Sequence, residues 1–430
     1  MLQNKRLYMD EKSKALFEDK WFSDYERKEI LETKIVENGI ILPIIDAHNS
    51  FNLPDAETGV LNSNKEYIVG SGMREFSFDN LIIPKKIEYD NREVMWGGML
   101  IFHYGHFILQ CTTRLYYYIQ NRDKIKHVIF VSKSNVLPSY INDFFSLINL
   151  PPEKIILIDE FRQFKKIICP PISSEYYGDY TNDFLMPFRE CSKKIEPARY
   201  EKVYLTRKHW HGVNKCFGEE NIEKLFNRNG FKSVSLEKLS LREQISIFKG
   251  AKIMAGINGT SFHNTLFSAS GQKLIMLNRN EEYDSQYIIN QATKANWYVI
   301  KVHLNPLPVT HPNGPFIVGV TEYMKQFLKD HGMKDFGIKF NPNKYLNSFL
   351  NKYCENYSNP SYYNELVARN KDKINCDDLI GIYLTLKYSK IILLKNYLLS
   401  KITIGKGRIY FKKLYKFTKS CKNNKIKNFY

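Results

Sequence analysis

The fold of this chain is decided by two short pieces of its sequence, Val203-Tyr204-Leu205-Thr206-Arg207 and Gly256-Ile257-Asn258-Gly259-Thr260-Ser261-Phe262-His263-Asn264-Thr265-Leu266-Phe267. The second piece predicts a strand, a turn that contains glycine, and the start of an apolar helix. Such a turn points backbone N–H groups and a helix N-terminus at one place, where an anion can bind. An arginine at the end of a neighbouring strand can bind the same anion through paired N–H donors. The two pieces therefore predict an α/β sheet with a phosphate site at its edge.

The alternation of short apolar runs and helical stretches continues on both sides. Strands are predicted at 127–131, 155–158, 166–169, 203–206, 233–236, 253–256, 274–277 and 297–302. Helices are predicted at 139–150, 218–229, 241–249, 261–269 and 320–330. Strands that alternate with helices are typical of parallel α/β sheets. We therefore predict two α/β domains, 1–190 and 191–330, with a proline-containing linker at 170–200 and a basic helical extension at 331–430.

The composition is that of a folded protein of 430 residues, with 43% hydrophobic and 14% aromatic residues. No apolar run reaches about 18 residues, so no transmembrane helix is predicted, and residues 1–20 do not resemble a secretory signal. The seven cysteines are widely spaced and form no Cys-x-x-Cys pair, which indicates free thiols in a reducing compartment. These features predict a cytoplasmic protein.

The net charge of +18 is concentrated near the C-terminus. Residues 379–430 contain 12 lysines, one arginine and no acidic residue, so they carry +13. Aromatic and aliphatic residues are mixed with these lysines, which suits an anionic membrane surface. A solvated lysine-rich tail is the alternative. No recognisable nucleic-acid-binding module accompanies the charge, so a nucleic-acid partner is not expected.

A second group of polar residues begins in Gly105-His106-Phe107-Ile108-Leu109-Gln110 and continues to Arg114. If this stretch is helical, His106, Gln110 and Arg114 fall on one face at positions i, i+4 and i+8. A polar stripe on an apolar helix faces either a cleft or buried polar groups. His106 is a candidate general base because the pKa of histidine lies near neutrality; a satisfied core histidine is the alternative. Asp159 directly follows a predicted strand and is the second candidate base.

The turn around Gly259 supplies the candidate phosphate ligands. Glycine there permits positive φ or close backbone approach, and hydroxyl side chains at the start of the following helix can cap it. The candidates are Arg207, Gly256, Asn258, Gly259, Thr260, Ser261 and Asn264. A turn with a purely structural role is the alternative.

Other anion-binding and metal-binding motifs are missing from the sequence. There is no Gly-x-Gly-x-x-Gly and no Gly-Lys-Ser/Thr, so dinucleotide and P-loop sites are not favoured. There is no Asp-x-Asp motif, and His209 and His211 supply two loop nitrogens without a third ligand. We therefore expect a site without a metal, in which Arg207, backbone amides and a helix N-terminus neutralise the phosphate.

These constellations, in this order, resemble glycosyltransferase family 61. The family has a segment like Gly-His-Phe-Leu-x-Glu followed by Arg-Leu, a strand that ends in Ser/Thr-Arg, a Gly-Phe step, Leu-Ser-x-x-Glu-Gln, and Gly-x-His-Gly-Ala-x-x-x-Asn-x-x-Phe. The corresponding residues are 105–110 with Arg114-Leu115, Thr206-Arg207, Gly230-Phe231, Leu239–Gln244 and Gly256–Phe267. The resemblance spans about residues 95–280.

The resemblance implies a GT-B architecture, in which two Rossmann-like domains face a cleft. It implies an inverting, metal-independent glycosyltransferase without a cofactor, whose donor is a nucleotide sugar, expected to be UDP-linked. His106 or Asp159 would be the base, Gln110 and Arg114 would face the acceptor, and the phosphate ligands would hold the donor. The acceptor would be a glycan or lipid-linked glycan in capsule or lipopolysaccharide synthesis, at the inner face of the cell membrane.

Three residues depart from the family pattern. Gln110 replaces an acid, Asn258 stands where many relatives have histidine, and Thr260 replaces alanine. A catalytically inactive GT-B relative is therefore an alternative, as is a protein that binds polyanions or nucleic acid through its basic tail.

Overall fold

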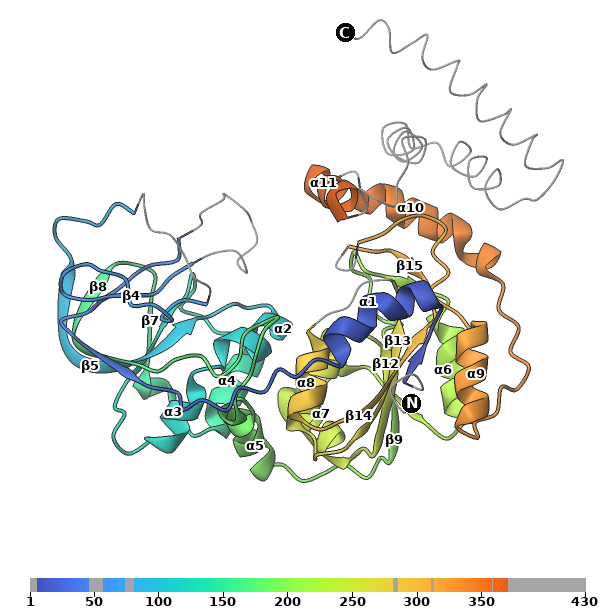
Figure 1. Cartoon of the computed structure of the whole chain (residues 1–430), viewed down its shortest axis with the longest axis horizontal. Helices are drawn as coiled ribbons and strands as arrows, with labels where there is room; N and C mark the ends of the chain where they lie inside the picture. The colour runs from blue at the N-terminus through green and yellow to red at the C-terminus, as the bar shows by residue number, and fades with distance from the viewer. Residues whose placement is uncertain are drawn as a thin grey trace, which may run out of the picture.

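The computed structural model describes residues 6–45, 57–73, 81–280, 285–310, 313–357 and 359–369. They form two large β-sheets, one in each half of the molecule, with helices packed around them (Figure 1). A third pairing joins the short strands β10 (Cys216–Phe217) and β15 (Phe316–Ile317).

The sheet of the C-terminal half has six strands, and every neighbouring pair is parallel. The strand order is β1 (Leu7–Tyr8), β14 (Asn296–Lys301), β13 (Lys273–Asn278), β12 (Ile253–Ile257), β9 (Lys202–Leu205) and β11 (Lys232–Val234). The five strands predicted between residues 203 and 302 are all present, with ends that differ by one or two residues. The prediction of a parallel α/β sheet is confirmed for this half.

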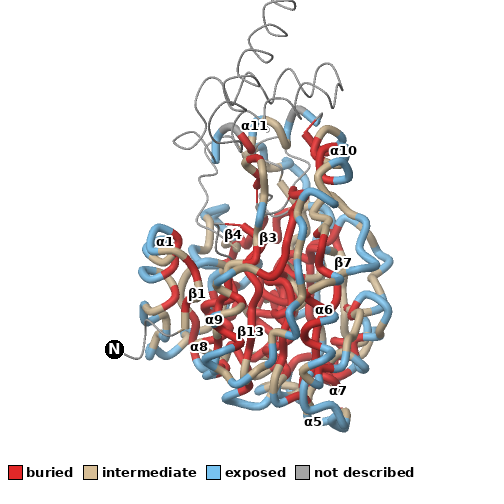
Figure 2. The backbone as a smooth tube through the Cα atoms, turned by 90° about the vertical axis from the view of Figure 1, so that its right-hand side faces the viewer, coloured by how far each residue is buried: buried red, intermediate tan, exposed pale blue. Residues whose placement is uncertain are grey.

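Alternate residues of these strands pack into two different hydrophobic cores, because successive side chains of a strand point to opposite faces. The covering helices are α6 (Glu219–Arg228), α7 (Leu241–Gly250), α8 (Gln286–Ala292) and α9 (Glu322–Asp330). On β9, Val203 and Leu205 pack on the side of α7 and α8, whereas Tyr204 packs on the side of α6 and α9. Figure 2 shows the buried residues gathered around β13. Because helices cover both faces, the strand ends are where a ligand can reach the sheet.

The sheet of the N-terminal half has seven strands and is mixed. They are β2 (Lys34–Glu37), β3 (Ile40–Ile41), β4 (Val60–Leu61), β5 (Glu88–Met99), β6 (Val128–Val131), β7 (Ile155–Ile158) and β8 (Arg162–Cys169). β5 pairs in parallel with β6 and β8, but β2 and β3 pair antiparallel with β8. The prediction of parallel strands is therefore right for the centre of this sheet and wrong for its edge. The sequence analysis missed β5, whose charged first half and Gly97-Gly98 are unusual in a central strand.

The two halves share one hydrophobic core. Residues 170–200 are not a simple linker, because they contain α5 (Met186–Lys193), whose Phe188 is fully buried. The ring centroid of Phe188 lies 5.9 Å from that of Phe144 in α4 (Ser139–Leu147) and 5.3 Å from that of Phe267 in the C-terminal half. Aromatic contacts therefore run through α5 from one half to the other.

The chain ends do not follow the predicted domain boundaries. β1 pairs with β14, and α1 (Glu11–Trp21) brings Trp21 within 4.9 Å of Trp297, so the first described residues pack with the C-terminal sheet and not with a domain of 1–190. Two helices after residue 331, α10 (Leu346–Tyr357) and α11 (Pro360–Arg369), also pack there, and Tyr353 is fully buried. The basic residues 379–430 lie outside the described residues. None of the helices in the described ranges is long and apolar enough to cross a membrane.

Candidate functional site

Polar residues follow three adjacent strands at the carboxyl edge of the C-terminal sheet. β9 is followed by Thr206-Arg207, β12 by Asn258-Gly259, and β13 by Arg279-Asn280. Although polar, Asn258 and Arg279 are each only 3% exposed. Ligands of open α/β sheets bind at this edge. The structure therefore brings Arg207, Asn258 and Gly259 together, as the sequence analysis expected, and adds Arg279.

Gly259 lies between two guanidinium groups. A Cβ atom at Gly259 would lie 3.5 Å from Nη2 of Arg279 and 3.9 Å from Nη1 of Arg207. The φ of Gly259 is 149°, a value that L side chains rarely adopt. Glycine therefore leaves room for an anion to approach the backbone between two permanent positive charges.

Two hydrogen bonds orient Arg207. Its Nη2 donates to Oδ1 of Asn214 at 3.0 Å, and its backbone N–H donates to Oε1 of Glu219 at 2.8 Å. Its Nε is buried and has no hydrogen-bond partner among the described residues. A buried donor without a partner costs about 1–3 kcal/mol, so an anion oxygen that reaches Nε would recover this loss.

The helix that follows Gly259 differs from the prediction. Residues Thr260–Phe267 form a 3₁₀ helix, and neither Thr260 nor Ser261 caps it. Its N-cap is Gly259, whose N–H donates to Oδ1 of Asn258 at 3.0 Å. The hydroxyl of Ser261 is buried without a partner among the described residues. A glycine cap fits because the chain arrives with a φ that threonine or serine does not favour.

Two of the predicted phosphate ligands make structural contacts instead. A Cβ at Gly256 would lie 2.9 Å from Cβ of Leu205, so this glycine allows β12 to pack closely against β9. Asn264 is completely buried, and its Nδ2 donates to Oε1 of Gln244 at 2.8 Å. The hydroxyl of Tyr104 donates to Oδ1 of Asn264. Both ends of this amide are therefore used within the protein, and Asn264 links the two halves.

A second contact holds the same segments together. A Cβ at Gly105 would lie 2.9 Å from Cγ2 of Thr260, which means that the start of α2 (Tyr104–His106) packs directly on the turn. The Leu-Ser-x-x-Glu-Gln segment contributes in two ways. Ser240 and Glu243 form a capping box at the start of α7, and this cap positions Gln244 to reach Asn264. The separate motifs of the sequence therefore meet at one place.

His106 lies next to this contact and is held on several sides. Its Nδ1 is 2.5 Å from Oε1 of Gln110, so the predicted i, i+4 contact is present. Its ring centroid lies 5.2 Å from that of Tyr176 and 5.1 Å from that of His103. Partial burial and the neighbouring His106 lower the pKa of His103. The sequence analysis missed His103 and Tyr176 as neighbours of the candidate base.

Arg114 does not lie where the predicted helical face would place it. Residues Phe107–Cys111 form a π-helical turn, which changes the angle between residues before and after it. Arg114 is 1% exposed, and its guanidinium donates to the backbone carbonyls of Pro170, Gly70, Ser71 and Gly72 at 2.8–3.0 Å. Its role is therefore to hold three chain segments together, and it is not available to an acceptor.

Asp159 is also separate from these residues. It is exposed after β7, the edge strand of the N-terminal sheet, and its Oδ1 accepts from the N–H of Ile44 at 3.3 Å. β6 lies between β7 and β5, the strand that leads to His106. The structure therefore does not bring the two candidate bases together.

Glu219 is a buried acid beside Arg207 that the sequence analysis did not select. It is 2% exposed, and the hydroxyl of Tyr204 donates to its Oε1 at 3.3 Å. Burial raises the pKa of Glu219 to about 7, although Arg207 opposes this shift. Position after a strand could have identified Arg279, as it identified Arg207; the burial of Glu219 has no comparable signal in the sequence.

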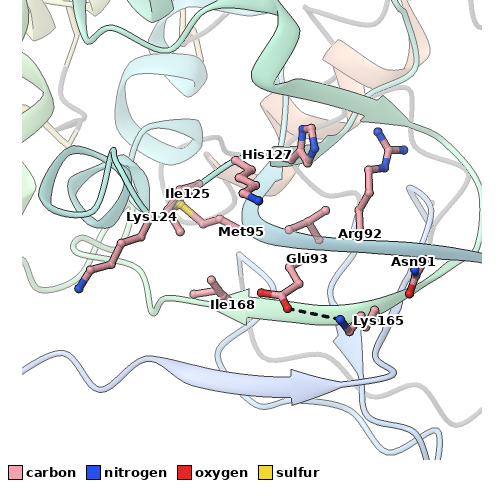
Figure 3. Close-up of a pocket in the computed structure, with 11 residues that line it drawn as sticks. Asn91, Arg92, Glu93, Met95, Lys124, Ile125, His127, Lys165 and Ile168 are labelled. Carbon is pink, nitrogen blue, oxygen red and sulfur yellow. Dashed lines mark ion pairs between the residues drawn. The ribbon is translucent and has the colours of Figure 1, made fainter.

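The described residues hold no cluster of metal ligands, and a cation-lined pocket lies away from this site. In the part of the chain that the structure describes, no three His, Cys, Asp or Glu side chains gather as metal ligands. A pocket of about 360 Å³ lies beside the amino end of β6 (Figure 3). Four cations line it, Arg92, Lys124, Lys126 and Lys165. Arg92 pairs with Asp90, and Lys165 lies 3.7 Å from Glu93. Parallel sheets bind ligands at the other edge, so this pocket is not part of the site.

Comparison with protein-family models identifies a match within this chain. Residues 104–275 match the family model described as Glycosyltransferase 61. The match begins at Tyr104 and ends within β13, so it includes both sides of the contact between Tyr104 and Asn264. Among curated proteins, none matches this chain.

Proposed function

The chain carries a glycosyltransferase family 61 domain in residues 104–275, and we propose that it transfers a sugar from a nucleotide donor to a glycan acceptor with inversion and without a metal ion. The family implies a transferase with a sugar donor and an acceptor. The observation that carries the finer proposal is the pair of guanidinium groups at Gly259, where a Cβ atom would lie 3.9 Å from Nη1 of Arg207 and 3.5 Å from Nη2 of Arg279.

The donor diphosphate would bind at this turn. In a metal-free reaction the leaving diphosphate gains negative charge, which fixed positive charges and N–H groups must stabilise. Arg207 and Arg279 supply the charges, and Ser261 supplies a buried hydroxyl with no partner among the described residues. Asn258 would shape the turn through its bond to the Gly259 N–H.

His106 would act as the base on the acceptor hydroxyl. The Oε1 atom of Gln110 can only accept a hydrogen bond, so its contact with Nδ1 places the proton on Nδ1 and leaves the lone pair on Nε2. An acid at position 110 would fix the same tautomer and would also stabilise the charged ring. Gln110 therefore preserves the geometry of the base but lowers its basicity relative to a carboxylate partner.

The architecture would be of the GT-B type. The parallel C-terminal sheet would bind the donor, and the N-terminal half would bind the acceptor beside His106. The predicted domains 1–190 and 191–330 would serve these roles, except that β1 and α1 pack with the donor-binding sheet. The reaction would take place in capsule or lipopolysaccharide synthesis at the inner face of the membrane, with residues 379–430 in contact with anionic lipids.

The test is a binding and turnover experiment on the full chain. A panel of nucleotide sugars, with UDP-sugars first, is screened by thermal shift with and without EDTA; a ligand at about 100 times its Kd adds about 2.7 kcal/mol of stability. Arg207→Ala and Arg279→Ala should abolish the shift. Arg92→Ala is the matched control, because Arg92 forms an exposed ion pair in the other half.

Turnover is then measured as release of nucleoside diphosphate in the presence of glycan acceptors, and the anomeric configuration of the product is determined by NMR. His106→Ala should remove turnover and retain donor binding. Binding without turnover for any acceptor would favour an inactive relative. No response to any nucleotide sugar would refute the donor site.

A further inference from the structure

Trp210 is an exposed aromatic side chain beside the proposed donor site. It is 43% exposed, whereas the other three tryptophans, Trp21, Trp96 and Trp297, are 6% exposed or less. Exposure of a large indole is unfavourable in itself. Its position three residues after Arg207 places it in the loop that leaves the carboxyl end of β9.

The indole is held rigidly toward Arg207. Its Nε1 donates to Oδ1 of Asn214, the same atom that accepts from Nη2 of Arg207. The guanidinium carbon of Arg207 lies 5.7 Å from the ring centroid. A Cβ at Gly212 would lie 2.7 Å from Nε1, so the loop backbone packs closely against the ring. Asn214 therefore fixes the arginine and the indole as one unit.

Two contacts connect the turn at Gly259 with both His106 and Trp210. Thr260, the residue after Gly259, packs against Gly105, which precedes His106 in the chain. Arg207, whose Nη1 would lie 3.9 Å from a Cβ atom at Gly259, also contacts the ring of Trp210. A nucleoside diphosphate bound through its phosphates at Gly259 and Arg207 would therefore have an exposed indole beside it.

We propose that Trp210 is the stacking platform for the base of the nucleotide sugar, an inference that rests on the proposed donor site. Stacking of a base on an aromatic side chain contributes about 1–3 kcal/mol by alanine substitution. Loss of the indole should therefore raise the Kd of a nucleoside diphosphate by about 5- to 150-fold.

The test follows tryptophan fluorescence and isothermal titration calorimetry of the full chain with UDP, GDP and inorganic pyrophosphate. Because the other tryptophans are buried, a base that stacks on Trp210 should quench the exposed component of the emission. Pyrophosphate should bind in the calorimeter and quench little, because it has no base.

The variants separate stacking from a supporting role. Trp210→Ala should weaken nucleotide binding and leave the Kd of pyrophosphate unchanged, and Trp210→Phe should retain part of the affinity. Tyr200→Ala is the matched control, because Tyr200 is 40% exposed near the opposite end of β9. An equal loss for nucleotide and pyrophosphate would overturn stacking and make Trp210 a positioning residue for Arg207. Nucleotide binding without quenching would also overturn it. If neither nucleotides nor pyrophosphate bind, the donor site itself fails.

Discussion

Replacing Gly105 by alanine tests the contact that joins the two halves of the site. The added Cβ would lie 2.9 Å from Cγ2 of Thr260, 3.3 Å from its Oγ1 and 3.4 Å from Cδ2 of His263. Real Cβ atoms almost never approach other heavy atoms closer than 3.0 Å. The start of α2 or the turn must therefore move.

The expected loss of stability follows from two opposing terms. Overpacking of this kind costs about 1–3 kcal/mol, and alanine in place of glycine in a helix gains about 0.5–1 kcal/mol. Gly105→Ala should therefore lower the free energy of unfolding by up to about 2.5 kcal/mol. The same displacement separates His106 from the turn at Gly259, and a shift of about 1 Å can reduce turnover by about 100-fold.

A double-mutant cycle with Thr260→Ser isolates the contact. Serine removes Cγ2 and keeps the hydroxyl, so the alanine at 105 regains space. Urea unfolding of the two single variants and the double variant should give a coupling energy of about 1–2 kcal/mol, with the double variant more stable than the sum predicts. Turnover, measured by nucleotide release, should recover in parallel.

The matched control is Thr265→Ser, which makes the same change in the same 3₁₀ helix. Thr265 is completely buried, and its hydroxyl donates to the carbonyl of Phe262 at 2.6 Å. Its effect should add to that of Gly105→Ala without coupling. Equal effects of Gly105→Ala in the presence of Thr260 and of serine would refute the contact between the two segments.

Four further changes test other parts of the structure. Arg114→Ala removes a donor from the carbonyls of Pro170, Gly70, Ser71 and Gly72, of which that of Ser71 still accepts from Nε1 of Trp96, and should cost roughly 2–4 kcal/mol in urea unfolding; a loss below about 1 kcal/mol would contradict its structural role. Gln110→Glu places a carboxylate beside Nδ1 of His106, which favours the charged ring, so the acidic limb of the pH–rate profile should move to higher pH if His106 is the proposed base. Burial raises the pKa of Glu219 from 4.5 to about 7. Between pH 4.5 and 7, Glu219 is therefore protonated in the folded protein and ionised in the unfolded chain. The free energy of unfolding falls as the pH rises through this range. Glu219→Gln should remove about 3 kcal/mol of that fall, measured by urea unfolding at pH 4.5 and 7.5. Replacing lysines of residues 379–430 by glutamine should weaken binding to anionic vesicles, and added salt should weaken binding of the unchanged protein; salt-independent binding would argue against an electrostatic tail.

The strands differ in how far the sequence could predict them. Apolar runs such as 253–256 and 274–277 became central strands, because a strand buried on both faces is apolar along its whole length. β5 could not be predicted in this way. Its charged first half gains stability from pairing with β8, and the register shifts at Asp90/Glu93 and at Trp96/Gly98 accommodate its irregular sequence.

The sequence by itself determined the parallel C-terminal sheet, the arginine after β9, the glycine turn after β12 and the resemblance to glycosyltransferase family 61. These are local properties, since periodicity, glycine and the position after a strand act over a few residues. Only the tertiary structure decided which polar residues share a site. Arg114 and Asn264 have motif positions like those of ligands, yet their hydrogen-bonding groups are used by carbonyls and amides from distant segments. Arg279 follows β13 and Arg207 follows β9, and these two strands flank β12, which leads to Gly259. This strand order follows from the pairing of the whole sheet.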